Sequence, residues 1–304
     1  MNSCVCGEEG GRPFDVSEHY FGLGHEFTYL ECDHCGSVRI ETIPSSLGAF
    51  YPDNYYSFSE AKTGWRVGLQ RAAMLFAVST PWPRLPWIHF SWASVVQSIG
   101  ISRSDRLLDV GSGAYGMAAR LRDVGHRNAL GVDPFVSHDI HDRYGLATRK
   151  AHLSDIDGEW DLITFNHSLE HVPDPVKELR LAKSFLSREG RIVVRLPLAS
   201  YAYKEYGRYY YGLDAPRHLF LPTEKGFREL AYRAGLSVSK VTYDSHYMQF
   251  FHSENYRQGI TLVSAESRYW ELITRRERRR LMNRACQLNR INQGDQAIFF
   301  LSPA

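Results

Sequence analysis

Short apolar runs and amphipathic stretches alternate along the chain from about residue 105 onward. Apolar runs of four to eight residues indicate buried strands, whereas apolar residues spaced three or four apart indicate helices. The predicted strands are 106–110, 129–132, 161–165, 191–196, 236–242 and 296–301, and the predicted helices are 114–124, 175–186 and 223–234. Strands that alternate with helices favour an α/β fold, with a mostly parallel sheet covered by helices on both faces.

The pattern is weaker in the first hundred residues. Residues 1–45 predict short strands and turns, and 46–100 predict an aromatic-rich connector with helices near 64–78 and 89–99. The connector contains the motif Phe50-Tyr51-Pro52-Asp53-Asn54-Tyr55-Tyr56. We therefore divide the chain into three parts, residues 1–45, 46–100 and 101–304.

Composition narrows the class of protein. The chain has 304 residues, 43% of them hydrophobic and 23% charged, as is typical of a globular protein with one large or two modest domains. The net charge is +2. This near-neutral balance argues against a nucleic-acid partner or electrostatic capture by an anionic membrane.

No targeting or membrane-spanning segment is expected. Met1–Arg12 is polar and lacks the basic start and apolar run of a signal peptide. The apolar stretch Ala72–Val96 is interrupted by three prolines and Arg84, so it does not predict a transmembrane helix. We expect a cytoplasmic protein, and the sequence leaves its oligomeric state open.

Four of the five cysteines lie in the first 35 residues, as the pairs Cys4/Cys6 and Cys32/Cys35. Two close pairs in a cytosolic chain indicate a metal site rather than disulfides. Four thiolates form a closed tetrahedral zinc site of structural type. The first pair has one intervening residue in place of the commoner two, which leaves open whether both of its thiols bind and whether His34 replaces one.

A glycine turn follows the first strand of the α/β region, in Asp109-Val-Gly111-Ser-Gly113-Ala-Tyr-Gly116. Such a turn fits a dinucleotide, whose pyrophosphate Asp109 would then face, or a different nucleoside cofactor. The ammonium and sulfonium of S-adenosylmethionine favour a nearby carboxylate, so Asp109 points to this methyl donor. Asp133 ends the next strand, where a carboxylate accepts hydrogen bonds from ribose hydroxyls or caps the turn before Pro134.

Three segments resemble the class I S-adenosylmethionine-dependent methyltransferases over about residues 105–301. They are Asp109-Val-Gly-Ser-Gly113, Gly131-Val-Asp133 and Asn166-His-Ser-Leu-Glu-His-Val172. The resemblance implies a Rossmann-like sheet of seven strands, the last antiparallel, with a small zinc-ribbon-like module before it. It also implies that Asn166 lines the methionine end of the cofactor.

Two histidines follow predicted strands at the edge where the acceptor should arrive, His171 and His218. A histidine near neutral pKa suits proton removal from an oxygen acceptor. We select His218 as general base, with Arg217 or Asp214 orienting the acceptor or the base. His171 is the second catalytic candidate, although a histidine at the start of a helix also bonds backbone groups.

A divalent metal is the alternative at this place. His167, Glu170, His171 and His218 supply imidazoles and a carboxylate, a donor set that holds such an ion next to an acceptor oxygen. Plant small-RNA 2′-O-methyltransferases and ubiquinone O-methyltransferases look similar here and carry Glu-x-x-Glu-His. This chain has His167 in place of the first Glu. Glu170 is a catalytic candidate whether a histidine base or a metal ion activates the acceptor.

The order of zinc module, aromatic motif, methyltransferase region and Asp-Ala-Pro-Arg-His resembles methyltransferases of bacterial sugar and polysaccharide biosynthesis. The related deoxysugar C-methyltransferases carry a C-terminal domain that this sequence lacks, so we expect O-methylation of a saccharide. A dense run of tyrosines, Tyr201–Tyr211, predicts either a lid over the acceptor or a packing surface. Ser253–Tyr256 is expected in a loop facing the acceptor. The competing functions are O-methylation of a quinone-like or other small phenol and a non-catalytic S-adenosylmethionine-binding scaffold.

Overall fold

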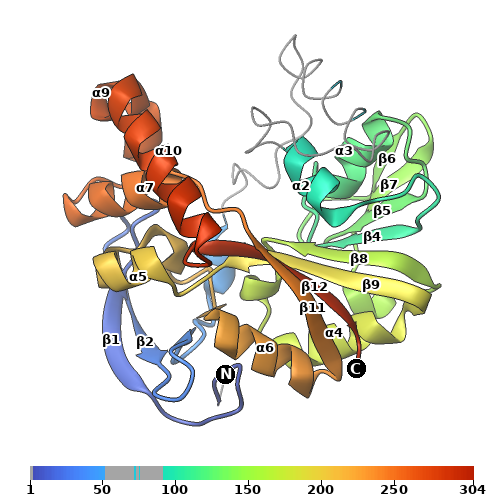
Figure 1. Ribbon diagram of the computed structural model, residues 1–304, viewed down its shortest axis with the longest axis horizontal. Helices are drawn as coiled ribbons and strands as arrows, with labels where there is room; N and C mark the ends of the chain where they lie inside the picture. The colour runs from blue at the N-terminus through green and yellow to red at the C-terminus, as the bar shows by residue number, and fades with distance from the viewer. Residues whose placement is uncertain (1–2, 52–71, 73–74, 76–91) are drawn as a thin grey trace.

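The computed structural model describes residues 3–51, 72, 75 and 92–304 (Figure 1). Within this range the helix predicted near 89–99 is confirmed as α2 (Trp92–Ile99). The helix predicted near 64–78 and the motif beyond Tyr51 fall outside the description, apart from the isolated positions 72 and 75.

The described residues form a main sheet of eight strands in the order β11-β12-β9-β8-β4-β5-β7-β6. The strands are β4 (Leu107–Val110), β5 (Ala129–Val132), β6 (Ile140–Asp142), β7 (Gly145–Arg149), β8 (Trp160–Asn166), β9 (Leu186–Pro197), β11 (Leu236–Tyr243) and β12 (Gln296–Pro303). The five central strands are parallel, and β12 runs antiparallel to both of its neighbours, as predicted for the last strand.

The expected number of seven strands is wrong by one. The additional strand is β6, which pairs antiparallel with β7 at the edge of the sheet. None of its three residues, Ile140–Asp142, is fully buried. A short, polar edge strand carries no apolar run, so the hydrophobic pattern gives no sign of it.

Helices cover both faces of this sheet (Figure 1). One face packs against α2 and α3 (Met117–Asp123), and the other packs against α4 (Pro175–Ser184) and α6 (Glu224–Arg233). Successive side chains of a strand point to opposite faces, which explains why Leu162 lies in one apolar cluster and Ile163 in the other. Near-continuous apolar strands are typical of a sheet buried on both sides.

The N-terminal residues form a second, four-stranded sheet. Its strands are β1 (Arg12–Ser17), β2 (Glu26–Glu31) and β3 (Val38–Ile40), joined by β10 (Phe220–Leu221) from the C-terminal α/β region. The Tyr29 hydroxyl also donates a hydrogen bond to the carbonyl of His218, 2.9 Å away. The N-terminal module is therefore tied directly to the segment that carries a predicted catalytic residue.

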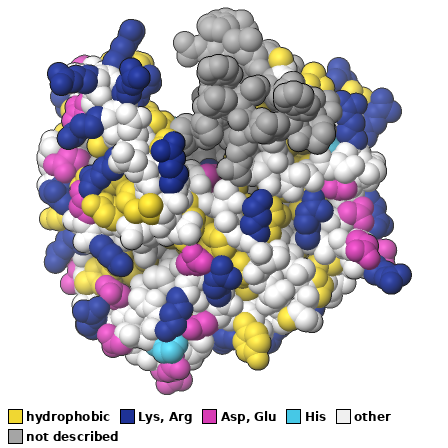
Figure 2. All heavy atoms as spheres, viewed as in Figure 1, with side chains coloured by type: hydrophobic (Ala, Val, Ile, Leu, Met, Phe, Trp, Pro, Cys, Tyr) yellow, Lys and Arg dark blue, Asp and Glu magenta, His cyan; other side chains and the backbone are white. Residues whose placement is uncertain are grey.

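Four helices lie between β11 and β12, namely α7 (Met248–Arg257), α8 (Leu262–Ser267), α9 (Tyr269–Leu272) and α10 (Arg275–Arg290). The loop predicted at Ser253–Tyr256 is wrong, because these residues lie inside α7. Figure 2 shows Lys and Arg side chains gathered over the end of the molecule that α9 and α10 form in Figure 1. Among the described residues, no helix is long and apolar enough to cross a membrane.

Candidate functional site

Asp109 lies near the end of β4, separated from the glycine turn by Val110. It is 2% exposed, with Oδ2 accepting a hydrogen bond from the Ala118 N–H (3.1 Å) and Oδ1 accepting one from the Thr164 hydroxyl (2.8 Å). Burial raises the pKa of Asp109 to about 6, against the opposing effect of these hydrogen bonds. The carboxylate thus anchors the first turn of α3, where negative charge is favourable. These two donors hold the carboxylate inside the protein at the end of β4.

The glycine turn itself requires glycine. Gly111 and Gly113 have φ values of 69° and 60°, in the left-handed region. A Cβ at Gly111 would lie 2.4 Å from the Cβ of Ser168, whose hydroxyl donates to the Val110 carbonyl (2.6 Å). The turn after β4 therefore closely approaches the segment after β8, which brings the predicted cofactor residues Gly111 and Asn166 to neighbouring strand ends.

Asp133 ends β5, beside the glycine turn, and is 7% exposed. Its Oδ2 accepts a hydrogen bond from the Gly113 N–H and its Oδ1 accepts one from the Phe135 N–H, both at 2.8 Å. Asp133 therefore caps the turn that follows β5, as one of the two alternatives predicted. Each carboxylate oxygen has a second lone pair, so Asp133 keeps the capacity to accept ribose hydroxyls. These residues fit a nucleoside cofactor at the carboxyl ends of the strands.

Arg195 orients two side chains at the carboxyl end of β8. Its Nη1 donates to Asn166 Oδ1 (3.3 Å) and to His167 Nε2 (2.8 Å). Because a guanidinium only donates, His167 Nε2 is unprotonated and Nδ1 carries the proton, 3.4 Å from Glu170 Oε1. The Nδ1 side of His167 thus faces Glu170 at ion-pair distance, without a hydrogen bond. It lies outside the group of metal-binding atoms described next, contrary to the expectation that it is a ligand.

Glu170 lies at the centre of the predicted reaction site and is fully buried. Neither of its carboxylate oxygens has a hydrogen-bond partner in the described structure. Burial raises the pKa of Glu170, but the neighbouring His167, His218 and His171 more than offset this effect and bring it to about 2. An ionised buried carboxylate without hydrogen bonds is costly unless a cation or proton donor faces it.

His171 and His218 are the two imidazoles that lie next to Glu170. Their rings meet edge to face with centroids 4.8 Å apart. His171 Nδ1 is 2.9 Å from the Arg217 carbonyl and His218 Nδ1 is 2.7 Å from the Gly212 carbonyl. Since a carbonyl oxygen only accepts, both Nδ1 atoms carry protons and both Nε2 atoms are free to accept a proton or bind a metal.

The three predicted catalytic residues are therefore brought together. One ligand atom each from Glu170, His171 and His218 lies within 4.8 Å of the others, and His218 Nε2 is 3.9 Å from both Glu170 Oε1 and Asp214 Oδ2. Burial, reinforced by the charge of His218, lowers the pKa of His171 to about 4. This arrangement is compatible with a histidine that acts as general base and also with a metal ion bound by Glu170, His171 and His218.

The Arg217 side chain is completely buried, and neighbouring residues of the protein occupy its guanidinium. It donates two hydrogen bonds to Asp214, at 2.9 and 2.5 Å, and its guanidinium stacks on the Tyr20 ring at 4.2 Å. Glu18 Oε1 lies 3.9 Å from Arg217 Nη1. Arg217 thus joins the N-terminal module to the turn that precedes His218, and Asp214 is the residue left to orient this base.

Tyr51 is a site residue that the sequence motif contained but did not single out. Its hydroxyl is 3.0 Å from His171 Nδ1, and its ring stacks on Phe135 with a centroid distance of 6.3 Å. Tyr51 therefore spans from the histidine pair to the loop that begins at Asp133. Only the three-dimensional structure places an aromatic residue of the connector at this point.

The tyrosine run divides into members of an apolar cluster and one, Tyr211, that contacts α7. Tyr203, Tyr206 and Tyr210 are buried in the apolar cluster that contains α5 (Tyr201–Tyr206), which favours the packing alternative for these three. Tyr211 instead starts the short turn Tyr211–Leu213, and its ring lies 5.0 Å from that of His252 on α7. The run as a whole is therefore not a lid.

The four N-terminal cysteines converge. Cys4 Sγ is 3.5 Å from Cys35 Sγ, Cys6 Sγ is 3.7 Å from Cys32 Sγ, and all four sulfur atoms lie within 4.8 Å of one another. A tetrahedron of sulfurs around zinc has edges of about 3.8 Å, from a Zn–S distance of about 2.3 Å. The thiols fit a zinc ion, and Cys286 lies apart from them on α10.

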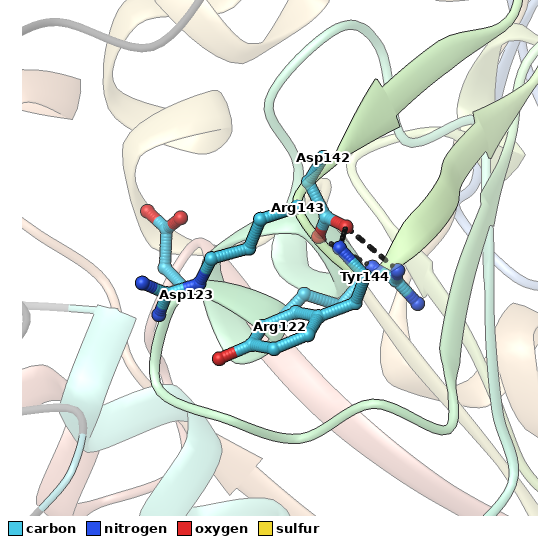
Figure 3. Close-up of a pocket in the computed structure, with 5 residues that line it drawn as sticks. All are labelled: Arg122, Asp123, Asp142, Arg143 and Tyr144. Atoms are coloured by element: carbon cyan, nitrogen blue, oxygen red, sulfur yellow. Dashed lines mark hydrogen bonds and ion pairs between the residues drawn. The ribbon is translucent and has the colours of Figure 1, made fainter.

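A pocket of about 260 Å³ lies at the opposite edge of the main sheet and is lined by Arg122, Asp123, Asp142, Arg143 and Tyr144. Figure 3 shows Arg122 paired with Asp142, with two hydrogen bonds of 2.7 and 2.9 Å. Because Asp142 pairs with the first residue of β7, this pocket is at the amino ends of the parallel strands. Ligands of such sheets bind at the carboxyl ends, so we do not assign it to the cofactor.

Comparison with known proteins identifies the class. A family model described as a methyltransferase domain matches residues 88–241, half of the chain, and the protein therefore belongs to this family. It is an S-adenosylmethionine-dependent methyltransferase, an enzyme of the EC 2.1.1 class. No curated protein sequence matches the chain.

Several solved structures resemble the fold. A mycolic acid cyclopropane synthase in complex with S-adenosylhomocysteine is 18% identical, with 86% of this chain and 99% of that chain covered and a TM-score of 0.46. The 1,6-didemethyltoxoflavin-N1-methyltransferase of Burkholderia thailandensis is 19% identical, with 77% and 92% covered and a TM-score of 0.41. The geranyl diphosphate C-methyltransferase of Streptomyces coelicolor is 12% identical, with 66% and 73% covered and a TM-score of 0.41. These values are too low to transfer an acceptor.

Proposed function

We propose that this enzyme transfers the methyl group of S-adenosylmethionine to an acceptor oxygen, a hydroxyl of a sugar or glycan, with His218 as the general base. The observation that supports the proposal best is the orientation of the two imidazoles around Glu170. Each has its Nδ1 proton directed to a main-chain carbonyl, which leaves Nε2 as the basic atom.

The cofactor supplies an electrophilic methyl group on a sulfonium. Asp133 would accept hydrogen bonds from its ribose, the backbone at Gly111 and Gly113 would allow close approach, and Asn166 would line its methionine end. Asp109 acts indirectly in this proposal, because its carboxylate already bonds Ala118 and Thr164 and so fixes the glycine turn. Such positioning of reactants supplies much of the acceleration in group transfer.

Removal of the acceptor proton would fall to His218 Nε2. The Gly212 carbonyl holds the ring by its Nδ1 proton, and the carboxylates of Glu170 and Asp214 lie 3.9 Å from Nε2. Two carboxylates near the ring stabilise the imidazolium that forms when the proton is taken up. His171 shares this role through its contact with the His218 ring, and Tyr51 orients His171.

A divalent cation at Glu170, His171 and His218 is the second candidate for activating the oxygen. The specific observation in its favour is that the Nδ1 atoms of both histidines are bound to carbonyls, as in metal sites, while Glu170 has two oxygens without partners. Such a cation would polarise the acceptor oxygen. The two candidates differ in metal content, which is directly measurable.

We also propose that Cys4, Cys6, Cys32 and Cys35 hold a structural zinc ion. The close approach of the four thiols supports this, and four thiolates leave no open position for catalysis. Zinc would stiffen the module that packs against His218 through Tyr29. The predicted division into residues 1–45, 46–100 and 101–304 remains part of the proposal.

The acceptor is tested with isotopically labelled S-adenosylmethionine and two sets of acceptors, methyl hexopyranosides and catechols. Methyl groups linked to glycoside oxygens support the proposal. Transfer to catechol alone supports the phenol alternative. Tight cofactor binding with no product in either set would contradict both the saccharide and the phenol as acceptors.

A further inference from the structure

Helix α7 presents a polar face to the protein interior. Gln249, His252, Ser253 and Tyr256 follow the spacing of one helical face, within about 100° of arc at 3.6 residues per turn. All four are buried, with His252 and Ser253 completely enclosed. A buried helix face is normally apolar, so a polar face here requires an explanation.

Most polar atoms of this face have no partner in the described structure. They are Gln249 Nε2, both ring nitrogens of His252, Tyr256 Oη and, beside them, Asn255 Nδ2. Buried polar atoms in folded proteins are almost always hydrogen-bonded, and leaving one unpaired costs free energy. Several such atoms on one helix indicate that something outside this chain provides their partners.

Aromatic rings surround the same face. Tyr211 lies 5.0 Å from His252 and 6.3 Å from Tyr256, measured between ring centroids. His19, from the N-terminal module, stacks on Tyr256 at 4.8 Å, and its Nε2 also has no partner. The site therefore combines ring faces with uncharged hydrogen-bonding groups, since burial lowers the pKa of His252 to about 4 and keeps it neutral.

One short turn connects this face to the reaction centre. In Tyr211–Leu213, the Tyr211 N–H donates to Ser253 Oγ on α7 (2.9 Å), and the next residue, Gly212, accepts the Nδ1 proton of His218. A ligand extending from His218 past this turn would meet the polar face of α7.

We propose that Gln249, His252, Asn255 and Tyr256, together with His19 and Tyr211, form a saccharide subsite that holds the acceptor next to His218. This inference rests on the proposed function and names its substrate class. Amide, phenol and imidazole groups match the hydroxyls of an uncharged sugar, and ring faces match its C–H surfaces. They match a phosphate or carboxylate less well, because those ligands recruit arginine or lysine.

The test uses apolar isosteres of the unpaired groups, Gln249→Met, Asn255→Leu and Tyr256→Phe, made singly. The probes are methyl hexopyranosides, detected by saturation-transfer NMR with S-adenosylhomocysteine present. Gln258→Met is the matched control, because Gln258 is exposed at the end of the same helix. The wild type and the control should bind a glycoside, and each isostere should weaken that binding about tenfold, as expected for one lost hydrogen bond.

Thermal unfolding separates a subsite from a structural network. Replacing an unpaired buried polar group by an apolar one is neutral or stabilising, so the melting temperature should stay level or rise. A lower melting temperature would mean that internal groups or buried water already pair these atoms, and this would overturn the inference. Unchanged glycoside binding in the isosteres would overturn it as well, as would the absence of glycoside binding to the wild type. Product analysis judges the proposed function separately, because a glycoside that binds but receives no methyl group on oxygen contradicts O-methylation of that sugar and leaves the subsite standing.

Discussion

His171 and His218 meet edge to face, with ring centroids 4.8 Å apart and ring planes at 64°. One ring follows β8 and the other follows β9, so the parallel sheet brings them to the same edge. Both Nδ1 atoms are held by main-chain carbonyls, and the buried Glu170 lies beside the free Nε2 atoms. This relationship makes proton removal from an acceptor the chemistry to test.

Replacing His218 should remove the base and leave the cofactor site intact. We expect His218→Gln to lower kcat by about 10²- to 10⁴-fold, the usual contribution of a general base. Affinity for S-adenosylmethionine should stay within about twofold of wild type, because His218 lies outside the glycine turn. The exposed His141→Gln is the matched control in steady-state kinetics. A loss below about threefold would show that another group takes the proton.

The metal content of the protein distinguishes a histidine base from a divalent cation at Glu170, His171 and His218. With a histidine base, atomic emission should find one zinc per chain, and His171→Ala should not change that number. Added Mg²⁺ or Mn²⁺ should leave the rate unaltered. A second metal equivalent that disappears in His171→Ala would contradict the histidine base and show that a metal ion activates the acceptor.

The cysteine cluster should determine both metal content and stability. Cys35→Ser should lose the zinc and lower the melting temperature by about 10 °C or more, because metal binding contributes directly to folding. Cys286→Ser removes a thiol on α10, outside the cluster, and should keep both properties. Equal zinc content in the two variants would contradict the assignment of these ligands.

Asp295 should make stability depend on pH. It is 1% exposed, one of its oxygens accepts a hydrogen bond from the Ala202 N–H, and burial raises its pKa from 3.8 to about 7. Between pH 4 and 7 the folded state therefore binds a proton that the unfolded state has released, so Asp295 costs stability as the pH rises through this window.

The difference between wild type and Asp295→Asn isolates this effect from the histidines. Relative to the variant, the free energy of unfolding of the wild type should fall by about 1.4 kcal/mol per pH unit between pH 5 and 7, and then level off. Urea unfolding across this range measures it. A difference that is independent of pH would mean that Asp295 is ionised throughout.

The strands β4, β5, β8 and β9 could be predicted because each contains a short apolar run, whereas β7 (Gly145–Arg149) contains too few apolar residues and was not predicted. Asp109 and Asp133 mark the ends of β4 and β5, and the predicted bounds of 129–132 for β5 were confirmed. The strand order and the meeting of Glu170, His171 and His218 follow from parallel pairing, which carries both histidines to one edge.

The remaining features depend on tertiary contacts that a local pattern does not encode. The sequence pattern predicted a loop within α7 because the buried face of this helix carries Gln249, His252 and Ser253 in place of apolar residues. The direction of the Asp109 carboxylate follows from Ala118 and Thr164, which lie on α3 and β8. The burial of Arg217 depends on Glu18 and Tyr20 of the N-terminal module, far away in the chain.

The most direct test of the account is calorimetry of the purified protein with S-adenosylmethionine, S-adenosylhomocysteine and NAD. Asp133→Asn is measured beside it, with the exposed Asp157→Asn as control. We predict micromolar binding of both sulfur nucleosides, no binding of NAD, and affinity lowered about 10- to 100-fold in Asp133→Asn alone, as expected for lost hydrogen bonds to a charged group. Binding of NAD without binding of the sulfur nucleosides would contradict the assignment of the glycine turn and the chemistry built on it.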